Sequence, residues 1–262
     1  MEPEAAFAKL MAGPLRNVAL DRACLLLATV LDPDPVDVER ELGRLDDLAA
    51  GITEPTLDAV RRHLFAREGF TGDREGYYEP ANSLLPSVLD RKRGIPITLS
   101  IVTIEVARRA GVALVGVGLP GHFLVGDPAD ANRFVDPFSG GQVLDRTGCE
   151  QLFKRLNGSG AKFLDHYLDP VGPREIVARV LGNLKQVAAA RGERRQLVRI
   201  LRLRAAIPGV GGQERVGLAD ALVGAGHFVE AAAELEQLAE RSRPTDADRL
   251  RQAAARARAR LN

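Results

Sequence analysis

The sequence GLPGHFLV occupies residues 118–125, and RFVDPF follows at residues 133–138. Residues 112–118 and 122–125 are short and rich in β-branched side chains, as strands are, and residues 133–135 start another strand after the turn-forming stretch DPADAN at residues 127–132. Two strands joined by so short a connection pair antiparallel. We therefore expect His122 of the first segment and Asp136 of the second to lie on neighbouring strands.

A helix is predicted ahead of these strands. The stretch RKRGIPITLS at residues 91–100 leads into an apolar run that continues to Ala110. Pro96 suits the first turn of a helix, because the N–H that it lacks needs no partner there. Gly111 suits the left-handed position that follows a helix. The pattern predicts a mostly buried helix packed on an antiparallel sheet, which is an α+β fold.

His122 and Asp136 are the residues of this region best suited to chemistry. An imidazole is a general base near neutral pH, and a carboxylate on one ring nitrogen fixes its tautomer. Such a pair activates a thiol or hydroxyl that lies within hydrogen-bond reach. The alternative is structural: a buried histidine satisfied by a nearby acceptor, with Asp136 starting an Asp-Pro turn.

Helical patterns flank this region on both sides. From about residue 3 to 68, apolar residues recur every three or four positions. Toward the C-terminus a repeat appears, in which each residue returns 34 positions later: Leu184, Gly192 and Leu201 correspond to Leu218, Gly226 and Leu235. This is the tetratricopeptide period, with glycine at the turn between two helices. We expect an N-terminal helical part at 1–70, a core at 71–170 and tetratricopeptide-like helices at 171–262.

Composition argues against several classes of function. The chain has 36 Lys and Arg against 35 Asp and Glu, so no net field favours nucleic acid or an anionic membrane. Its two cysteines make neither a disulfide framework nor a metal site, so we expect no metal and no cofactor. The acidic N-terminus and the lack of a long apolar run predict a cytoplasmic protein without a membrane span.

Four ordered motifs carry a resemblance to a known family. They are YYEPANS at residues 77–83, LDRKRGIPITLS at 89–100, PGHFLV at 120–125 and VDPF at 135–138. In these motifs the chain resembles the transglutaminase-like superfamily. More narrowly it resembles the SirB-type proteins, in which such a core is followed by tetratricopeptide-like helices. The resemblance implies a transglutaminase-like, papain-like fold for the core.

The resemblance also implies roles for individual residues. His122 and Asp136 match the histidine and aspartate of the family's catalytic triad. In active members a cysteine begins the core helix, where the helix dipole favours the thiolate. Here that place falls at about residues 96–98, which read Pro-Ile-Thr. Thr98 and Ser100 are the hydroxyls that could substitute, although each is better suited to capping the helix or binding a carbonyl one turn back.

The sequence thus leads to three hypotheses of function. The first is a degenerate member that binds a protein or peptide through its old active-site cleft and its helical repeats. The alternative is a hydrolase or acyl transferase on amide bonds, in which His122 activates Thr98 or Ser100 and Asp136 orients His122. The third is a small-molecule binder built around His122.

Three polar residues before the core helix are candidates for binding. Glu79, Asn82 and Ser83 lie in an irregular segment, where they could line a cleft beside His122 or simply close turns and cap a helix. Glu79 and Asn82 would complete the small-molecule site of the third hypothesis.

Overall fold

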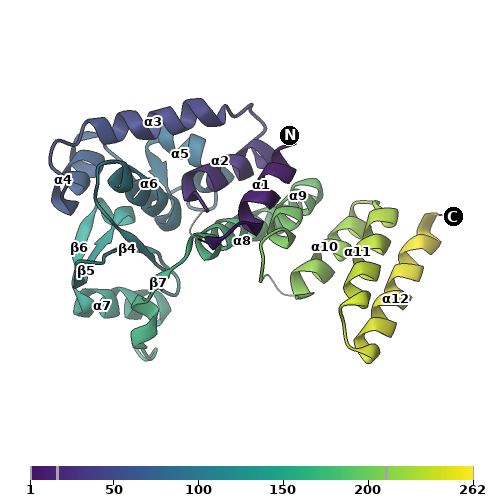
Figure 1. Cartoon of the computed structure of the whole chain (residues 1–262). Coiled ribbons are helices and arrows are strands. Elements are labelled where there is room, and N and C mark those ends of the chain that lie inside the picture. Colours follow the sequence, from purple (N-terminus) through teal and green to yellow (C-terminus); the bar gives the residue numbers. More distant parts are fainter. Residues whose placement is uncertain (1, 16–17, 210–211, 262) are drawn as a thin grey trace. The chain divides into compact units, whose positions relative to one another are not determined.

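The computed structural model describes residues 2–15, 18–209 and 212–261. The chain divides into two compact units, one formed by Pro14–Val180 and the other by Met1–Gly13 with Leu181–Asn262 (Figure 1). Each unit is described by itself below. The three-part division at residues 70 and 170 stays a prediction.

Seven helices of the first unit lie wholly within it, among the residues that the structure describes. They are α2 (Leu20–Leu31), α3 (Val38–Ala50), α4 (Leu57–Arg61), the π-helical turn η2 (Arg62–Arg67) that continues α4, α5 (Leu85–Arg91), α6 (Pro96–Arg109) and α7 (Arg146–Asn157). Three short 3₁₀ turns lie in the connections between elements of this unit: η3 (Pro80–Ser83), η4 (Pro137–Ser139) and η5 (Asp165–Leu168). The helical character predicted for about residues 3–68 is confirmed for the helices between residues 20 and 67. Residues 16 and 17 of that range lie outside the described residues.

The main sheet of this unit has five strands in the order β6-β5-β4-β3-β7, and all neighbours run antiparallel. Its strands are β3 (Val115–Val117), β4 (Leu124–Asp127), β5 (Asp130–Asp136), β6 (Gln142–Leu144) and β7 (Pro170–Val171). A separate parallel pair joins β1 (Thr71–Gly72) to β2 (Arg93–Gly94). Helices and a mostly antiparallel sheet make this unit α+β, as predicted.

Alternate residues of β4 and β5 pack on opposite faces of the sheet. Leu124 and Phe134 join a core cluster with Leu152 and Phe153 of α7. The next residues along, Val125 and Val135, pack instead with Leu57 of α4 and Ile104 of α6. Because strand side chains alternate in this way, α7 covers one face and α4 with α6 covers the other (Figure 1).

Helix α6 is the central helix of this unit. It contacts α2, α3 and α5 as well as β3 and β4, and all of its residues from Pro96 to Thr103 are buried. It begins at Pro96, and Gly111 beyond its end has φ +79°, as the sequence predicts.

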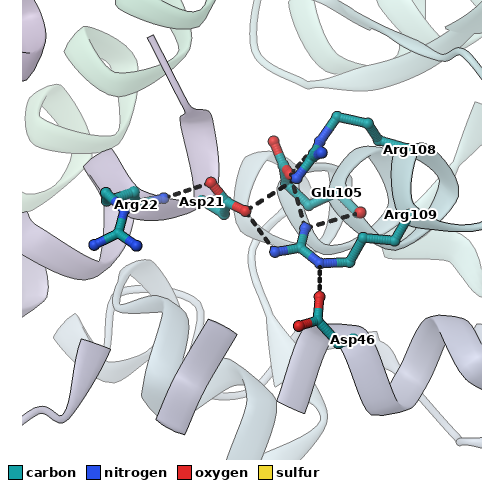
Figure 2. A network of polar contacts seen from close by, with 6 residues as sticks. All are labelled: Asp21, Arg22, Asp46, Glu105, Arg108 and Arg109. Carbon is teal, nitrogen blue, oxygen red and sulfur yellow. Dashed lines mark hydrogen bonds and ion pairs between the residues drawn. The ribbon is translucent and has the colours of Figure 1, made fainter. Parts of the chain in front are cut away.

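Charged side chains at the C-terminal end of α6 tie it to α2 and α3 (Figure 2). Arg109 donates hydrogen bonds to Asp21 of α2 over 2.6 Å and to Asp46 of α3 over 2.6 Å. Arg108 also donates to Asp21 over 3.2 Å. Glu105, one turn earlier, accepts from Arg108 over 2.9 Å and from Arg109 over 3.0 Å. Asp21 and Glu105 are both buried, so this network lies partly in the core.

The second unit is helical throughout its described residues. It holds α1 (Pro3–Ala12), which packs on α9, the end of α8 (Pro173–Arg191), α9 (Arg194–Ala205), α10 (Gly212–Gly224), α11 (Phe228–Glu240), α12 (Pro244–Arg258) and the 3₁₀ turn η6 (Ala259–Leu261). Gly192 and Gly226 occupy the turns after α8 and α10 with φ of +68° and +85°. Both glycines stand where the repeat places them, but the tetratricopeptide assignment itself stays a prediction.

Candidate functional site

His122 and Asp136 meet at one end of the main sheet, where β5 ends and just before β4 begins. The His122 Nε2 atom lies 2.9 Å from Oδ1 of Asp136, and both side chains are buried. Asp136 is the last residue of β5, but His122 precedes β4 and does not belong to it. The prediction that His122 begins a strand is therefore wrong. A reverse turn holds it, in which Gly121 has φ +80° and the His122 N–H donates to the Leu119 carbonyl.

The Asp136 carboxylate binds backbone as well as His122. Its Oδ1 atom accepts from the Phe138 N–H over 3.0 Å and from the Ser139 N–H over 3.4 Å, so it also caps the turn η4. Burial raises the pKa of Asp136, but hydrogen bonds from His122 and Ser139 and the charge of His122 outweigh it and lower that pKa overall. Since the carboxylate has no proton, Nε2 of His122 must donate. When the ring is neutral, Nδ1 is therefore its acceptor.

Arg179 of α8 fixes the turn that carries His122. Its Nη2 atom donates to the carbonyls of Leu119 over 3.2 Å and His122 over 3.0 Å, and its guanidinium lies 5.2 Å from the Phe123 ring centroid. A Cβ atom on Gly118 would lie 2.4 Å from this guanidinium, so glycine leaves the room that it needs. Arg179 is not predicted by the sequence, because nothing local to residue 179 indicates a partner so distant along the chain.

A pocket of about 680 Å³ opens beside His122. Aromatic and apolar side chains form much of its walls, and two arginines lie among them. The lining residues are Arg74, Tyr77, Tyr78, Gly121, His122, Asp136, Phe138, Ser139, Leu152, Arg155 and Leu156. The Asn157 amide donates to the Pro120 carbonyl over 3.1 Å, which ties the end of α7 to the turn before His122. The arrangement can hold an apolar group against a polar floor.

Aromatic rings form a row from the surface to His122. Tyr78 is 72% exposed and its ring lies 5.2 Å from that of Tyr77. The Tyr77 ring lies 5.9 Å from that of Phe138, which lies 5.9 Å from the His122 ring. All three pairs meet edge to face, the geometry that aromatic quadrupoles favour.

Asn82 holds the loop that carries Tyr77. Its Nδ2 atom donates to Asp73 over 3.1 Å and to the Gly76 carbonyl over 2.6 Å, and its Oδ1 accepts from Arg91. The side chain is fully buried. These bonds fix one wall of the pocket from behind, although Asn82 itself does not line it.

The other two candidate binding residues also lie outside the lining of this pocket. Glu79 is exposed, and Ser83 is buried in η3 beside Asn82. The binding role of Glu79, Asn82 and Ser83 stays a prediction.

The hydroxyl groups of Thr98 and Ser100 donate hydrogen bonds to backbone carbonyls. The Thr98 hydroxyl donates to the Asn82 carbonyl over 2.7 Å and accepts from the Ile95 N–H over 3.2 Å, so it caps α6. The Ser100 hydroxyl donates to the Pro96 carbonyl one turn back over 2.8 Å. Neither hydroxyl bonds to His122 in the described structure, and neither residue lines the pocket. The role of Thr98 and Ser100 in a catalytic triad stays a prediction.

Both cysteines are buried away from the start of α6, Cys24 on α2 and Cys149 on α7. Burial, together with the charges of Glu105 and Asp21, raises the pKa of the Cys24 thiol far above its ordinary range. Burial, with the charges of Asp145 and Asp136, raises the pKa of Cys149 to about 12. Neither thiol is poised to ionise near neutral pH.

Neither a metal-binding cluster nor a membrane-spanning helix occurs among the described residues. No three His, Cys, Asp or Glu side chains gather there as a metal site would require. No helix in the described ranges combines the length and the apolar character needed to cross a bilayer.

Comparison with protein families gives one match. The pattern described as "Transglutaminase-like superfamily" matches residues 31–182, which is more than half of the chain. The matched range contains the His122 pocket and the helix α6.

Similar proteins occur in bacteria and in mammals. A UPF0162 protein of Xylella fastidiosa is 44% identical over 140 residues, which cover 51% of this chain and 49% of that protein. The UPF0162 protein of Pseudomonas aeruginosa is 36% identical over 157 residues, covering 60% and 57%. F-box only protein 21 of Homo sapiens is 30% identical over 150 residues, covering 54% and 23%. The aligned part spans about half the length of the bacterial relatives. No solved structure matches the chain.

Proposed function

This chain belongs to the transglutaminase-like superfamily, and from that premise we propose that it is a degenerate member without the nucleophilic cysteine, whose His122 pocket binds a protein or peptide segment. The observation that carries the proposal is the state of the two hydroxyls. Thr98 and Ser100 each donate their one proton to a backbone carbonyl, and neither lines the pocket. A hydroxyl held in this way has no base to activate it.

The pocket supports binding of a chain segment. Its volume of about 680 Å³ lies within the range of roughly 300–1,000 Å³ that is usual for ligand sites. The Nδ1 acceptor of His122 can receive a backbone N–H, and the walls of Tyr77, Phe138 and Leu152 can cover an apolar side chain. Peptide-binding sites commonly combine such a polar anchor with apolar walls.

Selection from a random peptide library displayed on phage tests this function. Two variants add a carboxylate at an exposed apolar residue: Leu156→Glu inside the pocket and Val143→Glu on β6 outside it. We expect selected peptides to bind wild type and Val143→Glu alike and to bind Leu156→Glu at least about tenfold more weakly. Peptides that bind all three proteins equally, or no selected peptide at all, would contradict the proposal.

An acyl-transfer enzyme remains the second candidate, because the His122–Asp136 pair has the 2.9 Å geometry of a base with its orienting carboxylate. Thr98 or Ser100 would have to leave its carbonyl and reach Nδ1. A fluorophosphonate probe followed by peptide mass spectrometry separates the two candidates. The binding proposal expects no adduct on Thr98 or Ser100. An adduct that disappears in Ser100→Ala or Thr98→Ala, and also in His122→Ala, would establish the enzyme.

We extend the proposal to the rest of the chain on sequence grounds. The chain is proposed to be of the SirB type and to work in the cytoplasm. Its parts are residues 1–70, 71–170 and 171–262, and the last part is proposed to form tetratricopeptide-like repeats. The 34-residue recurrence of Gly192 at Gly226 supports the repeats, since both glycines take a left-handed φ at a turn between helices.

A further inference from the structure

We propose that the segment bound in the His122 pocket is acidic: one aromatic or aliphatic side chain flanked by aspartate or glutamate carboxylates. This inference rests on the proposed function and names the chemistry of its ligand. Arg74 and Arg155 would hold the carboxylates, and the row of Tyr78, Tyr77 and Phe138 would receive the apolar side chain.

The two arginines of the pocket differ from most charged side chains of this unit. Arg74, on the loop after β1, and Arg155, in the last turn of α7, are exposed and form no ion pair with any described carboxylate. Lys154, the neighbour of Arg155, pairs with Glu150 over 2.7 Å. The two guanidiniums come from different elements of the pocket wall, so they can meet carboxylates on both sides of one bound residue.

The pocket holds a single carboxylate of its own, and that charge is already engaged. Asp136 binds His122 and the backbone of η4. No lining side chain is therefore a free anion that would repel an acidic ligand. Guanidiniums bind carboxylates through charge-assisted hydrogen bonds, which favours a carboxylate over a neutral amide.

Exposed apolar surface at the same pocket indicates the other half of the ligand. Tyr78 is 72% exposed and Leu156 is 49% exposed, and they stand at the pocket with Arg74 and Arg155. The Arg74 guanidinium lies 5.1 Å from the centroid of the Phe138 ring, so cation and apolar wall adjoin. Exposed apolar side chains next to unpaired charges of one sign mark a surface for an amphipathic partner of opposite charge.

Four capped, fluorescein-labelled heptapeptides test the inference by fluorescence anisotropy with the full chain. The first has one phenylalanine between two pairs of glutamates, and the others replace glutamate by glutamine, glutamate by lysine, or phenylalanine by alanine. The protein variants are Arg74→Gln, Arg155→Gln and their double, with Arg67→Gln, an exposed arginine outside this pocket, as the matched control.

We expect the acidic phenylalanine peptide to bind most tightly and its affinity to fall with salt. Each pocket variant should weaken it by about fivefold and the double by more, with Arg67→Gln unchanged. The glutamine peptide should bind all variants alike. Because the substituted arginines are exposed, an unchanged melting temperature is expected and separates lost binding from lost folding.

Several results would overturn the inference. Equal binding of the glutamine and glutamate peptides that is lost on Leu156→Glu would remove the acidic ligand and keep the proposed function. Binding of none of the four peptides would count against both. A fluorescein-labelled oligothymidylate that binds more tightly than the acidic peptide, with the same dependence on Arg74 and Arg155, would assign the pocket to nucleic acid and overturn the proposal.

Discussion

At the scale of single residues, Asp136 joins the fold to the candidate site. One carboxylate oxygen accepts from the His122 ring and from the N–H of Phe138. We expect Asp136→Ala to lower the free energy of unfolding by about 2–4 kcal/mol, because it leaves buried donors without an acceptor. Asp136→Asn keeps an acceptor oxygen and should cost less. Urea unfolding measures both, with the exposed Asp130 of the same strand, changed to Ala, as control.

If Asp136→Ala unfolds at the same urea concentration as the Asp130 control, the carboxylate has no part in stability. The pair would then be a feature of the pocket alone.

The pKa of Asp136 makes a second prediction at this scale. Burial raises it, but the hydrogen bond and charge of His122 hold it below that of the unfolded chain. A carboxyl with a lowered folded pKa contributes stability above its unfolded pKa and loses it as pH falls through the folded value. The wild type should therefore lose more stability below about pH 4 than Asp136→Asn does. Parallel pH profiles of unfolding for the two proteins would contradict this assignment.

At the scale of elements, local pattern sufficed for α6 and its flanks but not for the turn at His122. Pro96 and Gly111 mark the ends of the helix because proline and glycine have backbone preferences of their own. The sequence predicts His122 in a strand, since its apolar neighbours fit one. The left-handed Gly121 ends that extended path, and Arg179, far along the chain, holds the turn. A single sequence contains no sign of that contact.

For the hydroxyls of α6, as for the ends of that helix, local pattern sufficed. A serine or threonine in the first turns of a helix can bond to backbone, and both Thr98 and Ser100 do. The local alternative that the sequence offered is thus the one seen. Asn82 is different: it bonds to Asp73 and Gly76 of the loop after β1 and to Arg91 at the end of α5, and no local pattern encodes that these segments meet.

The charged network at the end of α6 carries a prediction for the elements that it joins (Figure 2). Burial and the charge of Asp21 raise the pKa of Glu105. Burial also raises the pKa of Asp21, but Arg109 and the Arg22 N–H outweigh it and lower that pKa overall. A carboxyl whose folded-state pKa is raised favours its protonated form. Its contribution to the stability of the protein is therefore present below the unfolded pKa and is lost as pH rises through the folded pKa.

Glu105→Gln, which mimics the protonated acid, should therefore leave the stability at neutral pH within about 1 kcal/mol of wild type or raise it. Asp21→Asn should cost about 2–4 kcal/mol, because it removes a buried anion that pairs with Arg109 over 2.6 Å. Thermal and urea unfolding at neutral pH measure both. Equal losses in the two variants would contradict the raised pKa of Glu105.

At the scale of the whole molecule, segments that lie far apart in the sequence belong to the same compact unit. Helix α1 at the N-terminus packs on α9 near the other end of the chain and is grouped with the C-terminal helices. Sequence periodicity shows that α1 has an apolar face but not which partner covers it. Each unit also has buried residues of its own, such as Leu218 and Leu222 in one and Val125 and Val135 in the other.

Because each unit has a core of its own, a destabilising substitution in one unit should leave the stability of the other unchanged. Gly226, between α10 and α11, has φ +85° with open space around a Cβ atom, so Gly226→Ala should cost only backbone strain of about 1 kcal/mol. Gly224→Ala is its matched control, since Gly224 ends α10 without a left-handed φ and also has room for a Cβ atom. In hydrogen exchange read by mass spectrometry, Gly226→Ala should speed the amides of α10 and α11 and leave those of β4 and β5 unchanged. Equal acceleration in both regions would show that the two units open together. In that event, the C-terminal helices would influence the proposed binding at His122 through stability alone.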